Sequence, residues 1–130
     1  MRKAEQKLWD TMKRNTPKTR WVQRVENLVG EGMPDLFIAP CYWIELKAPK
    51  PVKRNATALL GPSKLRPAQI GWHLRAYTHA IDSYILIRVD GGKEIFLLPG
   101  RMAAHVNEMT MTEIRSQSAA SSWVELWRIF

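Results

Sequence analysis

The stretch Asp35-Leu36-Phe37-Ile38-Ala39-Pro40-Cys41-Tyr42-Trp43-Ile44-Glu45-Leu46-Lys47 decides the fold of this chain. Residues 35–39 and 42–47 are two short runs rich in aromatic and β-branched side chains, which favour extended structure. Pro40-Cys41 separates the two runs, so the pattern predicts a β-hairpin that turns at this pair.

Three ionisable side chains are expected to meet within that hairpin. Glu45 and Lys47 are two residues apart, so the alternation of side chains along a strand places them on one face. With the turn at Pro40-Cys41, the numbers of paired residues add up to about 80 or 81, which puts Asp35 opposite or diagonal to Glu45 with Cβ atoms ~5–8 Å apart. The sequence therefore predicts two carboxylates beside one ammonium.

Such a cluster indicates metal-dependent chemistry. Two carboxylates that converge on a buried hairpin repel one another and need a compensating cation. Mg²⁺ binds one or two carboxylates and completes its shell with water and phosphate oxygens, which a DNA backbone can supply. Lys47 would steady the attacking water or the charge that develops on the phosphate, so the cluster predicts phosphodiester hydrolysis. In the alternative interpretation, Glu45 and Lys47 are exposed charges of an edge strand, and Asp35 is a turn residue.

The sequence on either side of the hairpin predicts helices and further strands. Apolar spacing favours a helix over residues 3–14 and a strand over residues 20–29, followed by a turn at Gly30-Glu31-Gly32. After the hairpin, residues 48–66 combine prolines with basic residues and show little periodicity, which is typical of a long exposed loop.

The second half of the chain completes the predicted order. Pro67 begins a helix whose apolar face is expected to consist of four residues at helical spacing: Ile70, Leu74, Tyr77 and Ile81. Residues 84–89 and 94–98 predict a second hairpin, residues 101–107 a helix, and residues 123–130 a final strand. The order α-β-β-β-α-β-β-α-β predicts an α/β (α+β) fold with a mixed central β-sheet flanked by helices.

Composition favours one globular domain, 1–130, with a polyanionic partner. The 130 residues are 45% hydrophobic and 25% charged, which is typical of a folded domain and excludes a disordered regulator. The formal net charge of +8 favours nucleic acid as the partner.

Cysteine content and hydropathy favour an intracellular protein. Cys41 is the only cysteine, which excludes an internal disulfide and a cysteine-based structural zinc site. The first seven residues are charged where a signal peptide is apolar, and no apolar run approaches the length of a membrane span. We therefore expect a cytoplasmic protein with no membrane partner and no small-molecule organic cofactor.

Three motifs in this order resemble those of the PD-(D/E)XK nuclease superfamily. Gly32-Met33-Pro34-Asp35 is followed by Ile44-Glu45-Leu46-Lys47-Ala48-Pro49 and then by Lys64-Leu65-Arg66-Pro67-Ala68-Gln69-Ile70-Gly71-Trp72-His73. This set is most similar to the virus-type replication-repair nuclease (VRR-NUC) branch, and the resemblance runs from Glu5 to about Val89. It implies a restriction-endonuclease-like sheet and a Mg²⁺-dependent DNA endonuclease, with Mn²⁺ as a substitute. Compact members resemble Holliday-junction (four-way junction) resolvases, and a viral or phage-encoded protein that acts in a host cytoplasm fits the resemblance.

The same resemblance implies roles for individual residues. Asp35 and Glu45 would bind the metal, Lys47 would be catalytic, and Gln69 would orient groups in the same cleft. Glu5 would complete the acidic cluster as a further metal ligand. In the alternative interpretation, Glu5 is a solvated residue of a first helical turn, where it complements the helix dipole.

Basic residues near the catalytic strand are expected to contact DNA phosphates, because a duplex must cross that edge of the sheet. They are Lys50, Lys53, Arg54, Lys64 and Arg66. His73 lies four residues after Gln69, so it could touch the DNA or the site, or it could be a packing residue.

The apolar segment 123–130 raises the question of a dimer. An exposed terminal strand of this composition would invite aggregation, so we expect it to be covered by its own sheet or by a second copy in a homodimer. A homodimer would carry two active sites suited to cutting both strands of a branched substrate. Two other functions stay open: a nicking or restriction-type nuclease on duplex or flapped DNA, and a non-catalytic nucleic-acid-binding protein.

Overall fold

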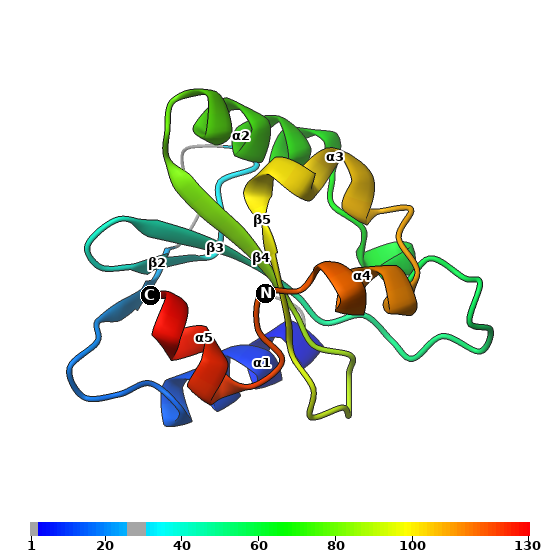
Figure 1. Cartoon of the computed structure of the whole chain (residues 1–130), viewed down its shortest axis with the longest axis horizontal. Helices are drawn as coiled ribbons and strands as arrows, with labels where there is room; N and C mark the ends of the chain where they lie inside the picture. The colour runs from blue at the N-terminus through cyan, green and yellow to red at the C-terminus, as the bar shows by residue number, and fades with distance from the viewer. Residues whose placement is uncertain (1–2, 26–30) are drawn as a thin grey trace.

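The computed structural model describes residues 3–25 and 31–130. Within these residues, five strands form one mixed sheet in the order β1-β2-β3-β4-β5 (Figure 1). The strands are β1 (Val22–Arg24), β2 (Leu36–Ile38), β3 (Tyr42–Lys47), β4 (Asp82–Ile87) and β5 (Phe96–Pro99). The helices are α1 (Lys3–Arg14), α2 (Pro67–Thr78), α3 (Ala103–Val106), α4 (Met111–Gln117) and α5 (Trp123–Ile129). The chain thus has a mixed α+β fold, as the sequence predicts.

The central hairpin has the predicted turn and the predicted register. β2 and β3 pair antiparallel, with Leu36 opposite Ile44 and Ile38 opposite Tyr42. Asp35, one residue before β2, is therefore level with Glu45. β3 then pairs in parallel with β4, after the chain has passed through α2, and β4 turns back antiparallel into β5.

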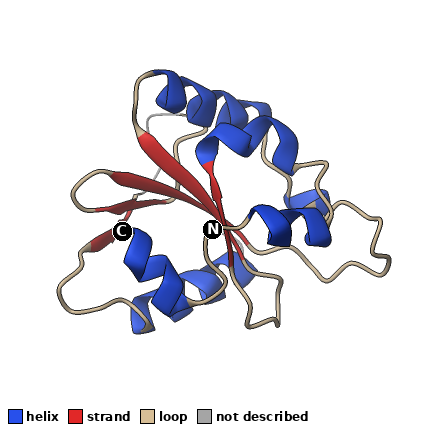
Figure 2. Ribbon diagram, in the orientation of Figure 1, coloured by secondary structure: helices blue, strands red, loops and turns tan. Residues whose placement is uncertain are grey.

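Alternation along β3 assigns its side chains to two faces of the sheet. Ile44 and Leu46 are fully buried in a core that includes Leu8 of α1 and Leu126 of α5. Glu45 and Lys47 point to the opposite face, which α2 and α3 cover (Figure 2). The polar side chains of β3 therefore lie between the sheet and α2.

Segment 123–130 is a helix, so the predicted final strand is wrong. Its apolar residues have the spacing i, i+3, i+4, i+7, which places them on one side of a helix: Trp123, Leu126, Trp127 and Phe130. Ser122 caps this helix by accepting the backbone N–H of Glu125 at 3.3 Å. Because the segment packs on the chain's own core, it gives no support to a homodimer that covers an exposed edge.

The apolar face predicted for α2 is also wrong. Three of its members are exposed by 36–61%: Leu74, Tyr77 and, beyond the helix, Ile81. The helix instead buries Gln69, His73 and Ala76. Glu45 and Lys47 lie beneath that face, and buried charged groups require polar partners, so the helix turns its polar side inward.

The remaining differences concern loops and element ends. β1 covers only Val22–Arg24 of the strand predicted over residues 20–29, and residues 26–30, including Gly30, lie outside the described residues. α4 has no counterpart in the predicted order. The predicted exposed loop 48–66 ends in buried apolar residues: Leu59, Leu60 and Leu65. None of the helices in the described parts of the chain has the length and apolarity needed to span a bilayer.

Candidate active site

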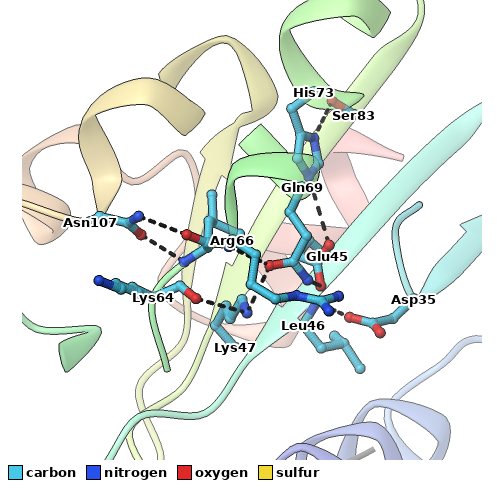
Figure 3. A network of polar contacts seen from close by, with 11 residues as sticks. Asp35, Glu45, Leu46, Lys47, Lys64, Arg66, Gln69, His73, Ser83 and Asn107 are labelled. Atoms are coloured by element: carbon cyan, nitrogen blue, oxygen red, sulfur yellow. Dashed lines mark hydrogen bonds and ion pairs between the residues drawn. The ribbon is translucent and has the colours of Figure 1, made fainter. Parts of the chain in front are cut away.

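Asp35, Glu45 and Lys47 meet on the sheet face that α2 covers (Figure 3). Glu45 and Lys47 lie on β3, and their exposed fractions are only 2% and 7%. The Oδ2 atom of Asp35 accepts the backbone N–H of Leu46 at 2.8 Å. This hydrogen bond ties Asp35 across the hairpin and holds its carboxylate beside Glu45.

A cleft of about 370 Å³ opens onto these residues. All the residues predicted to be catalytic line it: Glu5, Asp35, Glu45, Lys47 and Gln69. Glu5 reaches the cleft from α1 and is half-buried, so the interpretation of Glu5 as a freely solvated residue does not fit the structure. Lys64 and Arg66 line the same cleft from the end of the loop that precedes α2.

The Gln69 side chain connects the acidic and basic parts of the site. Its Nε2 donates to Glu45 Oε2 at 3.2 Å, and its Oε1 lies 3.4 Å from the Nζ of Lys47, which donates to it. The same Oε1 accepts the backbone N–H of Arg66 at 2.8 Å, at the first turn of α2. A carboxylate accepts hydrogen bonds, whereas an ammonium and an N–H donate them, so only one orientation of the Gln69 amide satisfies all three partners.

Glu45 carries an unfavourable charge in this environment. Burial raises the pKa of Glu45 well above its ordinary value, and the charge of Asp35, a side-chain hydrogen bond with Asp35 and the charge of Glu5 raise this pKa further. The ammonium of Lys47 acts in the opposite direction and lowers it. The ionised form of Glu45 is therefore unfavourable in this site and calls for a positive charge beside it.

The donors of this cluster fit a hard divalent cation. Two carboxylates this close to one another need a positive charge beside them, and Mg²⁺ can supply it. Across residues 3–25 and 31–130, no group of three or more His, Cys, Asp or Glu side chains forms a ready-made metal site. Asp35 and Glu45 would therefore supply part of a coordination shell that water and phosphate oxygens complete, as is usual for Mg²⁺.

A glycine brings the loop before β2 against the first turn of α2. Gly32 has φ +79°, and a Cβ at this position would overlap the backbone C and O of Ala68 and lie 2.8 Å from the backbone N of Gln69. The sequence predicts a glycine turn here but not this close approach. Gly32 thus sets how near the start of α2, and with it Gln69, sits to the hairpin.

His73 lies beneath the site and not on a DNA-facing surface. Its side chain is fully buried, so of the two predicted places, the DNA or the site, the structure puts it at the site. Its Nδ1 lies 2.7 Å from the Oγ of Ser83, and its Nε2 lies 4.0 Å from Glu45 Oε1. Burial lowers the pKa of His73 to about 4, with the charge of Asp35 opposing and that of Lys47 reinforcing the shift, so the imidazole is neutral at pH 7.

The basic residues predicted to bind DNA occupy two places. Lys64 and Arg66 are exposed and line the cleft, whereas Lys50, Lys53 and Arg54 are exposed on the loop outside its lining. Asn107, which no sequence pattern pointed to, holds the backbone between Lys64 and Arg66. Its Oδ1 accepts the N–H of Leu65 at 2.7 Å, and its Nδ2 donates to the C=O of Leu65 at 2.9 Å.

No family model, curated protein or solved structure matches this chain.

Proposed function

We propose that the protein is a divalent-metal-dependent endonuclease that hydrolyses phosphodiester bonds in DNA. The observation that supports this most is the pair of carboxylates formed by the buried Glu45 and the half-buried Asp35, which lies with the ammonium of Lys47 in one open cleft. A protein that only binds phosphates gains nothing from two carboxylates that repel each other and its ligand. The repulsion between the two carboxylates, and between them and the DNA, is offset once a cation binds between them.

The proposed roles follow from the hydrogen bonds of each side chain. Asp35 and Glu45 would hold Mg²⁺, and Gln69 keeps Glu45 Oε2 turned toward the cleft. When bound, Mg²⁺ neutralises charge on the phosphate and lowers the pKa of an attacking water.

Lys47 is placed to act on the water or on the phosphate. Its ammonium has three donors, and the described part of the chain supplies acceptors for two of them, the Oε1 of Gln69 and the C=O of Lys64 at 3.5 Å. The remaining donor can hold the attacking water or a phosphate oxygen, where charge develops in the transition state.

The charge distribution supports DNA as the substrate. The chain has a formal net charge of +8, and the cleft wall carries Lys64 and Arg66. A DNA backbone at the carboxylate pair would lie within reach of these two side chains, and the loop that follows β3 carries three more exposed basic residues, Lys50, Lys53 and Arg54. Four-way junctions are the substrate we favour, on the basis of the resemblance to compact junction-cleaving nucleases.

Cleavage of two DNA substrates tests this proposal. Purified protein with Mg²⁺ should nick a labelled four-way junction faster than a linear duplex of the same sequence. Asp35→Asn should abolish cleavage of both substrates and leave DNA binding unchanged, because the amide keeps the size of the side chain and loses its charge. Equal rates on both substrates would reject junction specificity alone, whereas binding without cleavage by the wild type would reject the nuclease assignment.

A further inference from the structure

Two buried polar atoms face each other beneath the cleft without a hydrogen bond. Glu45 Oε1 and His73 Nε2 are 4.0 Å apart, and neither has a partner within residues 3–25 and 31–130. A buried polar atom without a partner is unfavourable, so a pair of them in one place calls for an explanation. The other oxygen of the same carboxylate already accepts from Gln69.

The opposite edge of the imidazole decides which nitrogen carries the hydrogen. The Nδ1 of His73 lies 2.7 Å from the Oγ of Ser83, which is 7% exposed. Within the described residues, this is the only hydrogen bond of the Ser83 hydroxyl, and a buried hydroxyl hydrogen needs an acceptor. If Ser83 donates to Nδ1, then the hydrogen of the neutral ring is on Nε2 and points toward Glu45.

The other tautomer fits the surroundings less well. A hydrogen on Nδ1 would leave the hydroxyl hydrogen of Ser83 without an acceptor in the described part of the chain. When the carboxylate of Glu45 is ionised, this tautomer would also turn the lone pair of Nε2 toward an oxygen that can only accept. Both consequences are unfavourable in a buried site.

Gly100 leaves room for the hydrogen bond between Ser83 and His73, because it has no Cβ. A Cβ at Gly100 would overlap the Oγ of Ser83 and lie 2.9 Å from Nδ1 of His73. The turn Gly100–Met102 therefore passes directly against the Ser83–His73 hydrogen bond. The pair is enclosed by backbone on one side and by the carboxylate of Glu45 on the other.

We propose that His73 is a positioning residue, held by Ser83 as the Nε2–H tautomer so that it directs a donor at Glu45 Oε1. A shift of about 1 Å would bring the two atoms to hydrogen-bond distance. The donor matters most when Glu45 is ionised, because each oxygen of a buried carboxylate then needs a partner. Gln69 would hold one oxygen and His73 the other, which fixes the plane of the carboxylate.

The consequence for the metal rests on the proposed function. If Glu45 binds Mg²⁺, then a residue that fixes its carboxylate strengthens metal binding without touching the metal, and loss of such a partner typically weakens binding by about 10- to 100-fold. The statement about the tautomer does not depend on any metal or on cleavage. The two statements can therefore fail separately.

The first test is NMR of the metal-free wild-type protein at neutral pH. Long-range ¹H–¹⁵N spectra distinguish a protonated from an unprotonated ring nitrogen. His73 should show an unprotonated Nδ1 and a protonated Nε2, and Ser83→Ala should weaken this preference. His79 is the internal contrast, because its Nδ1 lies 2.9 Å from the C=O of Arg75, which can only accept and so favours a hydrogen on Nδ1. A protonated Nδ1 in His73 would overturn the proposal.

The second test measures Mg²⁺ binding by calorimetry. His73→Leu keeps an apolar side chain in the space but removes the donor, and we expect its affinity to fall by about 10- to 100-fold. His73→Gln restores an N–H donor and should recover most of that loss. Equal affinities of the Leu and Gln variants would overturn the positioning role. A wild type that binds no Mg²⁺ would overturn the proposed function, and the NMR result would still decide the tautomer.

Discussion

Replacement of Gly32 by alanine tests how the site is assembled. Gly32 combines a positive φ of +79° with a Cβ position that backbone atoms of Ala68 and Gln69 already occupy. Backbone atoms cannot rotate away as the end of a flexible side chain can. The added methyl group must therefore push the first turn of α2 away from the hairpin.

The expected loss of unfolding free energy in Gly32→Ala has two parts that can be measured separately. An alanine at positive φ costs about 1–2 kcal/mol, and overpacking against the backbone adds about 1–3 kcal/mol, so Gly32→Ala should lose about 2–5 kcal/mol of unfolding free energy. Gly91→Ala is the matched control, because Gly91 has φ +82° and nothing within 4 Å of its Cβ position. That variant should lose only the first part.

Urea unfolding of both variants measures the difference, and cleavage by the folded protein measures the effect on the site. A displacement of Gln69 by about 1 Å should lower the cleavage rate by about 10²-fold in Gly32→Ala. Gly91→Ala should cleave at the rate of the wild type. Equal losses of stability in the two variants would refute the claim that Gly32 sets the position of α2.

Three further predictions concern the basic loop, the buried histidine and the cleft wall. Lys53→Ala should weaken DNA binding and reduce the slope of log affinity against log salt by about 1. Lys18→Ala is the control, because Lys18 is also exposed but lies between α1 and β1 and not on the loop that follows β3, and it should leave the slope unchanged. Equal slopes for both variants would reject the phosphate contact. The pKa of His73 is about 4 in the folded protein and 6.5 in the unfolded protein. The unfolded state therefore takes up a proton at a higher pH, so the free energy of unfolding falls as the pH decreases from 6.5 to 4. In metal-free urea unfolding, the wild type should lose about 3 kcal/mol more than His73→Gln over this range, and parallel losses would contradict the shift. Asn107→Ala should lower the free energy of unfolding by about 1–3 kcal/mol, because it leaves both backbone groups of Leu65 without these partners. Asn107→Asp keeps the acceptor but sets a carboxylate oxygen against the C=O of Leu65, so it should lose at least as much in the same assay, and no loss in either variant would contradict this role.

Local rules were sufficient for the central hairpin. The turn at Pro40-Cys41 fixes the pairing of β2 with β3, and alternation then places Glu45 and Lys47 on one face. Both are short-range properties that depend on neighbours in sequence. The approach of Asp35 to Glu45 follows directly from this register.

The helices were harder to predict because two periods fit the same residues. Segment 123–130 alternates over several positions, yet Ser122 followed three residues later by Glu125 matches the capping pattern of a helix start. Thr110 and Glu113 show the same pattern at α4, and both side chains make the reciprocal hydrogen bonds. Capping residues would have corrected both segments where periodicity alone did not.

The supporting residues of the site depend on contacts far apart in sequence. Ser83 reaches His73 from β4, and Asn107 reaches Leu65 across 42 positions. Serine and asparagine are common in loops and strand ends, so nothing local marks these two. The predicted direction of α2 failed for a related reason, since the burial of Gln69 and His73 is decided by the charges of β3 beneath them.

The most direct test of the central claim is cleavage of labelled DNA by the wild type and by Glu45→Gln, each with Mg²⁺ and with a chelator. The amide removes the charge of the buried carboxylate and nearly preserves its shape, so the variant should fold and bind DNA. We expect cleavage by the wild type in Mg²⁺ alone and none by Glu45→Gln in either condition. Cleavage by Glu45→Gln at the wild-type rate, or cleavage by the wild type in the chelator, would contradict the account.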